Sequence, residues 1–143
     1  MSKKKVAIVQ PKSLAKGLLA GLIGGLVGVV AMAAAERFIP HRARVKAESP
    51  DDAPKSTADS MHWTFGAAVG AAYGAAAEYF PTATSEKGAA FGMALETLSQ
   101  QGTLPALGLL TGSAPRVSAG QLTSHVVYGV TTEVVRGFVR KRL

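Results

Sequence analysis

The chain has no cysteine among its 143 residues, so disulfide bonds and thiolate chemistry are both excluded. Acidic residues are also scarce. Nine Asp and Glu residues stand against sixteen Lys and Arg residues, which gives a net charge of +7. Such a charge suits either nucleic acid or anionic lipid. Aromatic residues make up only 6% of the chain and do not interleave with basic ones, which argues against nucleic-acid binding.

Charge is missing altogether from one long stretch, Gly17 to Ala35. A helix needs about 20 apolar residues to cross the hydrocarbon core of a bilayer, and this run is just long enough. Lysines precede it, and basic residues also end the chain: Lys3, Lys4, Lys5, Lys12 and Lys16, then Arg136, Arg140, Lys141 and Arg142. Basic residues beside apolar spans are typical of cytoplasmic ends that face anionic lipid. Residues 1–16 are therefore expected to form a basic cytoplasmic tail, and residues 17–143 a single membrane domain.

A pattern of small residues followed by a glutamate recurs along the chain. Residues 24–40 read GGLVGVVAMAAAERFIP, and residues 66–81 read GAAVGAAYGAAAEYFP. Residues four apart share one face of a helix, where Gly allows two backbones to approach closely. The glycines expected at such GxxxG contacts are Gly24, Gly28, Gly66, Gly70, Gly74, Gly88, Gly92 and Gly129.

The sequence predicts an all-α membrane bundle of about four transmembrane helices, near residues 17–38, 61–80, 86–110 and 117–139. A break is expected between Gln100 and Pro105, and the proline-rich, charged residues 39–60 are expected to be a linker. Two alternatives stay open. Residues 1–35 also resemble a signal peptide that ends in an A-x-A cleavage motif at Ala33 and Ala35, although the same AAAE sequence recurs at 75–78, where no cleavage is expected. The fourth helix, the least apolar, could instead lie on the membrane surface.

With four spans, the two termini and the 81–87 loop share one side, which holds ten Lys and Arg residues against six on the other. The positive-inside rule then places the N- and C-termini in the cytoplasm.

The glutamates are the costly residues, because a carboxylate within a bilayer must face inward, pair or protonate. Glu36 and Glu78 are expected near the membrane interfaces, as is Glu133, which pairs with Arg136 one turn away. Glu96 and His125 are expected to meet near mid-membrane. This candidate polar site also includes Glu133, with Gln100, Gln121 and Thr131 as hydrogen-bonding neighbours. It would be either a proton-relay or ligand site, or a buried polar contact that fixes the register of the two helices.

Other chemistry has little support. The three histidines lack metal-ligand spacing, the Glu-x-x-His pattern of di-iron bundles is missing, and no phosphate-binding loop is present. No nucleophile lies in a catalytic motif. We therefore expect no catalytic, metal-binding or cofactor-binding residues, and a protein that is not an enzyme.

The second half of the chain resembles the YagU-like family of small bacterial inner-membrane proteins, whose molecular role is uncharacterised. The resemblance rests on His62-Trp63 leading into VGAAYGAAAEYFP, on LPALGLLTG at 104–112, and on HVVYGVTTEVVR at 125–136. It implies a helical bundle in the bacterial inner membrane and supplies no catalytic residues. The chain departs from the family in its compact linker, where relatives carry a longer aromatic-rich segment.

Two functions are compatible with these features. The first is a non-enzymatic subunit, anchor or scaffold in contact with membrane lipid and with another copy or another membrane protein. The second is a small proton or solute carrier that uses Glu96, His125 and Glu133. A carrier should place its glutamates on inward faces at graded depths, whereas a scaffold should leave a glycine stripe facing outward. The glycines of helix 17–38 cover more than one face, which favours a partner.

Overall fold

The computed structural model describes residues 11–38, 55–100 and 119–143, and every element in these ranges is helical. The helices are α1 (Leu14–Phe38), α2 (Lys55–Tyr79), the 3₁₀ helix η2 (Pro81–Gly88), α3 (Ala89–Gln100) and α5 (Ala119–Arg140). The prediction of an all-α bundle is therefore confirmed for the part of the chain that the structure describes.

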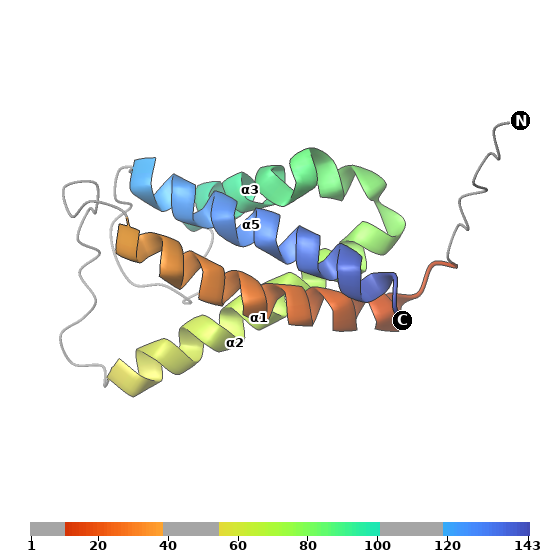
Figure 1. Cartoon of the computed structure of the whole chain (residues 1–143), viewed down its shortest axis with the longest axis horizontal. Coiled ribbons are helices and arrows are strands. Elements are labelled where there is room, and N and C mark those ends of the chain that lie inside the picture. The colour runs from red at the N-terminus through yellow and green to blue at the C-terminus, as the bar shows by residue number, and fades with distance from the viewer. Residues whose placement is uncertain (1–10, 39–54, 101–118) are drawn as a thin grey trace, which may run out of the picture.

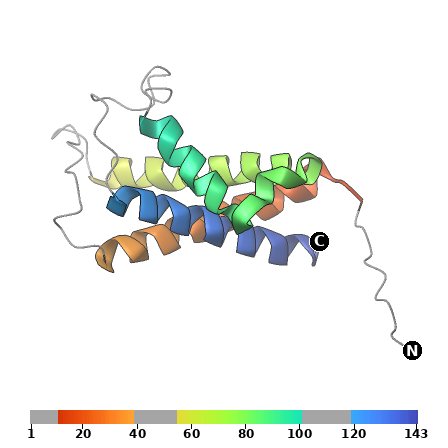
Figure 2. The same ribbon diagram turned by 90° about the horizontal axis from the view of Figure 1, so that it is seen from above.

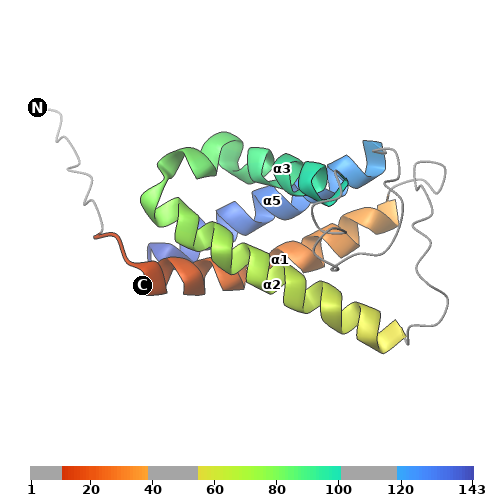
Figure 3. The ribbon, with the colours of Figure 1, turned by 180° about the vertical axis from the view of Figure 1, so that it is seen from behind.

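Helix α1 packs against both α2 and α5, and α3 packs against α5 (Figure 1). Helix α1 runs antiparallel to α2 and α5, and α3 runs antiparallel to α5. The view from above shows η2 leading the chain from the end of α2 over α5 (Figure 2). Seen from behind, α2 crosses α1 obliquely (Figure 3). The start of α1, the end of α2 and the end of α5 consequently lie at one end of the bundle.

Two glycine-lined faces explain why α1 can serve two neighbours. Gly17, Gly21 and Gly25 are buried against Gly74, Gly70 and Gly66 of α2. A Cβ atom at Gly25 would lie 2.9 Å from the Cα of Gly70. On its other face, a Cβ at Gly24 would lie 2.6 Å from the Thr132 carbonyl oxygen of α5, and one at Gly28 would lie 2.5 Å from Thr132 Oγ1. Only glycine permits backbones to approach this closely.

The contact between α3 and α5 is also built from glycine. A Cβ at Gly129 would lie 2.6 Å from the backbone nitrogen of Gly92. Gly88, at the end of η2, adopts φ = +89°, and a Cβ there would meet the Gly129 carbonyl oxygen. Glycine meets both requirements at this position, because it tolerates positive φ and leaves room for the neighbouring backbone.

Several predicted boundaries differ from the observed ones. The predicted helix 86–110 begins at Ala89, because Glu86 and Lys87 adopt φ values of 53° and 52° that turn the chain out of an α-helix. Glu86 therefore does not lie in the first turn of that helix. Residues 55–60, predicted as linker, belong to α2, since they are polar but contain no Gly or Pro. Helix α1 begins three residues before Gly17.

Part of the prediction falls on residues that the structure does not describe. The expected break between Gln100 and Pro105, the rest of the predicted helix to 110, and the linker 39–54 lie there. The last helix is observed as α5, which ends one residue beyond the predicted 139.

By length and composition, α1 is the single helix among the described residues that could cross a membrane. Its 25 residues extend about 37 Å at 1.5 Å per residue. Helix α3, with 12 residues, is about 18 Å long and would not cross alone. The apolar core is small: Val29, Met32 and Tyr128, with Phe91 and Leu95 against them.

Candidate functional site

Glu96 and His125, predicted to meet, lie within hydrogen-bonding distance of each other between α3 and α5. Glu96 Oε2 lies 2.8 Å from His125 Nδ1, and Glu96 is only 2% exposed. The same Nδ1 lies 3.0 Å from the Gln121 carbonyl oxygen, one turn earlier in α5. With Glu96 ionised, both neighbours of Nδ1 are acceptors, so Nδ1 carries the proton. The pair can therefore hold a proton between a carboxylate and an imidazole.

The pair lies within the length of α5. His125 is the seventh residue of α5, about 9 Å from the start of the helix. It is about 7 Å from the middle of the helix, and the mid-membrane position stays a prediction. Gln121 contributes its backbone carbonyl, and the side chain of Gln100 lies outside the described part of the structure.

Glu133 forms the predicted intrahelical pair with Arg136, but it also contacts a second helix. Arg136 Nε and Nη2 donate to the two carboxylate oxygens of Glu133 at 2.6 Å and 2.8 Å. The Tyr73 hydroxyl of α2 donates to Glu133 Oε2 at 2.9 Å. Sequence analysis missed Tyr73, although its place between Gly70 and Gly74 on the packing face of α2 was a usable signal.

Glu78 was predicted as an interfacial charge, and the structure gives it a partner that sequence analysis did not assign. Arg140 Nε donates to Glu78 Oε1 at 2.5 Å, and Arg140 Nη2 donates to Oε2 at 2.9 Å. The Ser13 backbone N–H adds a bond of 3.1 Å, and Arg140 also reaches the Pro11 carbonyl. The hydrogen bonds from the Arg140 guanidinium lower the pKa of Glu78, and this effect outweighs the rise in pKa that burial causes. One ion pair therefore joins α2, α5 and the residues that precede α1.

The centre of the bundle, between these ionic groups, is filled by aromatic rings. Tyr73 and Phe91 stack with their centroids 4.1 Å apart, and Phe91 lies 6.0 Å from Tyr128. The Tyr128 hydroxyl donates to the Gly66 carbonyl at 2.7 Å. Tyr128 comes between His125 and Glu133 along α5. The rings therefore separate the Glu96–His125 pair from the Glu133–Arg136 pair.

Three of the four glutamates singled out by sequence thus lie on inward faces at different heights, each beside a cationic or imidazole partner. Glu36 is half-buried close to the end of α1. All eight glycines predicted at helix contacts lie against a neighbouring helix, whereas a Cβ at Gly137, which was not among them, would meet nothing within 4 Å. Sequence analysis interpreted the many glycines of α1 as the sign of a partner. In the structure these glycines pack against α2 and α5 of the same chain.

The outer surface is apolar along most of its length. Between Lys16 and Arg37, every large side chain exposed on α1 is apolar: Leu18, Leu19, Leu22, Val27 and Val30. Trp63 and Phe65 of α2, Met93 and Leu98 of α3, and Val134 of α5 add to this surface. Among the described side chains, exposed charges occur in the loops, in η2 and near helix ends: Lys12, Lys16, Arg37, Glu86, Lys87, Lys141 and Arg142.

Metal chemistry gains no support from this arrangement, because no group of three or more potential ligands occurs among the residues that the structure describes. The His62 side chain is exposed on α2, and it is distant in sequence from Glu96 and His125.

No protein-family model matches the chain, and neither the curated proteins nor the solved structures yield a significant match. The geometry of the chain itself must therefore carry any functional conclusion.

Proposed function

We propose that this chain is an integral protein of the bacterial inner membrane, most simply a non-enzymatic subunit or anchor. The observation that carries the proposal is the distribution of polarity: large apolar side chains are exposed along α1 and on parts of α2, α3 and α5, and Glu78, Glu96 and Glu133 turn inward to partners. In water, an apolar surface of this kind would promote aggregation. In a bilayer it is the surface that lipid tails solvate.

The inward groups fit the same environment. A charged side chain in hydrocarbon is tolerated when it faces other helices and has a partner. Glu96 lies within 2.8 Å of His125, and Glu133 accepts two bonds from Arg136. Glycine faces supply the close helix packing that replaces the hydrophobic effect inside a membrane.

The proposed arrangement has four passages through the bilayer. Helix α1 makes one. Helices α2 and α5 are not apolar enough to cross alone, and each makes one as part of the bundle. The 3₁₀ helix η2 and α3 together make the fourth, because α3 is too short to do so alone. Both ends of the described chain lie on the same side (Figure 1). That side carries Lys12, Lys16, Lys141 and Arg142, so the positive-inside rule makes it cytoplasmic. Glu78 and Arg140 then lie at the cytoplasmic interface, outside the spans.

The proposed role as a subunit or anchor rests on the apolar face of α1. Both glycine faces of this helix are occupied within the chain, so another membrane protein or a second copy would meet its leucine and valine face. The resemblance to the YagU-like family agrees with a helical protein of the inner membrane.

Site-directed labelling tests the topology, because the chain has no cysteine of its own. We expect Lys87→Cys and Lys141→Cys to react with a membrane-impermeant maleimide only after the cytoplasmic face is exposed. Arg37→Cys should react from the outside of intact cells. Labelling of all three in intact cells, or release of the protein by alkaline carbonate, would contradict the proposal.

A second candidate function, a proton or solute carrier, is favoured by one observation: Glu78, Glu133 and Glu96 occupy successive heights on inward faces. Proton flux into liposomes tests it, with the native chain measured beside Glu96→Gln and His125→Ala. Flux that both changes abolish would support a relay. Native protein no leakier than empty liposomes would remove this candidate and leave the anchor.

A further inference from the structure

The end of the bundle where α1 begins and α5 ends carries a dense group of exposed cations. We call it the basic end face and define it by Lys12, Lys16, Lys141 and Arg142. The 3₁₀ helix η2, which carries the exposed side chains of Glu86 and Lys87, begins at the same end (Figure 1). At the opposite end, Arg37 is the one exposed charged side chain among those that the structure describes. The described side chains at the two ends therefore differ strongly in charge.

The cations of the basic end face are held in place by their neighbours. Lys16 Nζ donates to the Leu143 carbonyl at 2.5 Å, which joins the first turn of α1 to the end of the described chain. The Arg142 guanidinium lies 4.0 Å from the centroid of the Phe138 ring, and Lys12 Nζ lies 6.0 Å from that of Tyr79. The nearby carboxylate of Glu78 is already bonded to Arg140, so it does not neutralise these cations.

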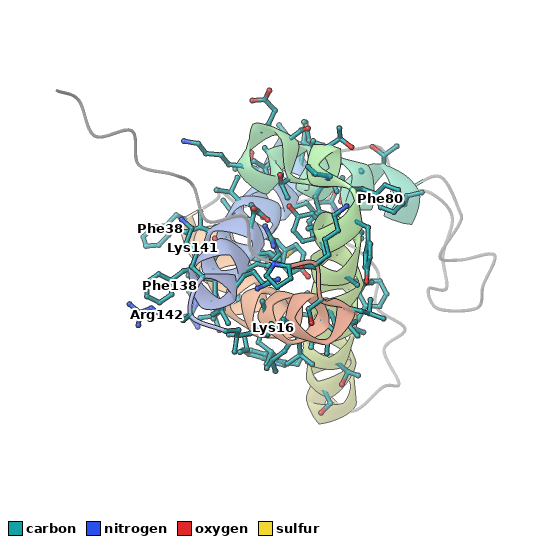
Figure 4. The ribbon with its side chains drawn as sticks, turned by 90° about the vertical axis from the view of Figure 1, so that its right-hand side faces the viewer. Lys16, Phe38, Phe80, Phe138, Lys141 and Arg142 are labelled. Carbon is teal, nitrogen blue, oxygen red and sulfur yellow. The ribbon has the colours of Figure 1, made fainter. Side chains whose placement is uncertain are left out.

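Exposed aromatic side chains surround this face. Phe80 is 65% exposed, Phe138 54% and Tyr79 45%. Figure 4, which looks onto this end, shows Phe138 beside Arg142, with Lys16 nearer the centre and Phe80 on the other side. Aromatic rings gather at the headgroup level of membranes, and the apolar surface of α1 continues from Leu18, just after Lys16.

We propose that the basic end face binds the phosphate groups of anionic phospholipids in the leaflet that surrounds it. This inference rests on the proposed membrane location. Charge complementarity supplies the attraction, since phosphates accept charge-assisted hydrogen bonds from guanidinium and ammonium groups. The aromatic rim and the adjoining apolar surface place the cations at headgroup depth, which favours lipid over RNA or an acidic peptide as the occupant.

The test uses the purified full chain in phosphatidylcholine vesicles that contain a trace of spin-labelled phosphatidylglycerol or spin-labelled phosphatidylcholine. The fraction of each label that the protein immobilises gives the relative association constant of the anionic lipid. One cation near an anionic surface contributes about 1 kcal/mol, a factor of about five. We expect a preference of at least about fivefold for the native chain, weakened in 0.5 M salt because ions screen surface charge.

Two sets of variants locate the preference. Arg142→Gln should lower it by up to about fivefold, and the triple change of Lys12, Lys141 and Arg142 to Gln should lower it further, to the roughly fivefold or less that Lys16 alone can supply. Arg37→Gln, which removes one exposed cation from the opposite end, is the matched control and should leave it unchanged. These positions leave Arg140 and Lys16 intact, so the contacts of both residues with neighbouring segments remain.

The possible outcomes distinguish the inference of lipid binding from the proposed membrane location on which it rests. A chain that carbonate strips from pure phosphatidylcholine vesicles would overturn the membrane location itself. A chain that stays inserted but shows no preference, or keeps it undiminished in the triple variant, would overturn only the lipid inference. Binding of an RNA oligonucleotide that the triple variant loses, without any lipid preference, would also overturn it.

Discussion

Gly70 stands at the centre of the contact between α1 and α2, and replacing it with Ala should weaken the bundle. A Cβ atom there would lie 2.6 Å from the Gly25 Cα, which is 0.8 Å short of the 3.4 Å at which ordinary contact begins. The atoms it meets are backbone, so no side chain can rotate away. The two helices must separate, and the neighbouring glycine contacts loosen with them.

The size of the effect follows from two opposing terms. Overpacking of this kind costs about 1–3 kcal/mol, whereas Ala gains up to about 1 kcal/mol over Gly in helix propensity. The net loss should be about 1–2 kcal/mol. Gly137→Ala supplies the control, because a Cβ there meets nothing within 4 Å. That change should keep the propensity gain and stabilise the protein by up to about 1 kcal/mol.

Thermal unfolding of the detergent-solubilised chain, followed by circular dichroism, measures both changes. We expect the midpoint to fall for Gly70→Ala and to rise or stay level for Gly137→Ala. If Gly70→Ala stabilised the protein as much as Gly137→Ala, the contact between α1 and α2 would be wrong, and with it the glycine-based packing of the bundle.

Three further predictions concern the polar contacts. Arg140→Gln removes the guanidinium that bonds the Glu78 carboxylate, and it should lower the free energy of unfolding by about 3 kcal/mol in chemical denaturation. Adding Glu78→Gln to this variant should recover part of that free energy. Because its folded-state pKa is lowered, Glu78 stabilises the protein above its ordinary pKa of 4.5 and loses this contribution as pH falls below that value. Glu78→Gln should therefore flatten the acid limb of the stability profile, and an unchanged limb would contradict the assignment. Tyr73→Phe removes one bond to Glu133 and should cost about 1 kcal/mol; no loss would mean that the Tyr73 hydroxyl does not support α2.

Helix positions and their apolar faces followed from local patterns, because a spacing of four residues specifies one side of a helix regardless of its neighbours. The kink at Glu86 and Lys87 did not follow, since neither residue type signals positive φ. Residues 55–60 were misassigned because polarity is a weak guide to helix ends. Composition could show that helix 17–38 suits a membrane, yet it could not show that both of its glycine faces are occupied within the chain.

The candidate site was partly accessible to the same reasoning. Glu96 and His125 were matched because both are polar residues inside apolar helices, and such groups need partners. Arg140 was not matched to Glu78, because the pairing depends on how the ends of α2 and α5 meet in space. The aromatic cluster of Tyr73, Phe91 and Tyr128 joins three helices, and no local pattern encodes such a contact.

The central claim is that lipid surrounds the outward face of α1, and one measurement tests it most directly. Leu22 and Val30 are 39% and 52% exposed on that face. Spin labels at Leu22→Cys and Val30→Cys, in reconstituted vesicles, report collisions with lipid-soluble oxygen and with a water-soluble nickel complex. The account predicts frequent collisions with oxygen and few with nickel at both positions. Frequent collisions with the nickel complex at both would contradict it, because the face would then lie in water.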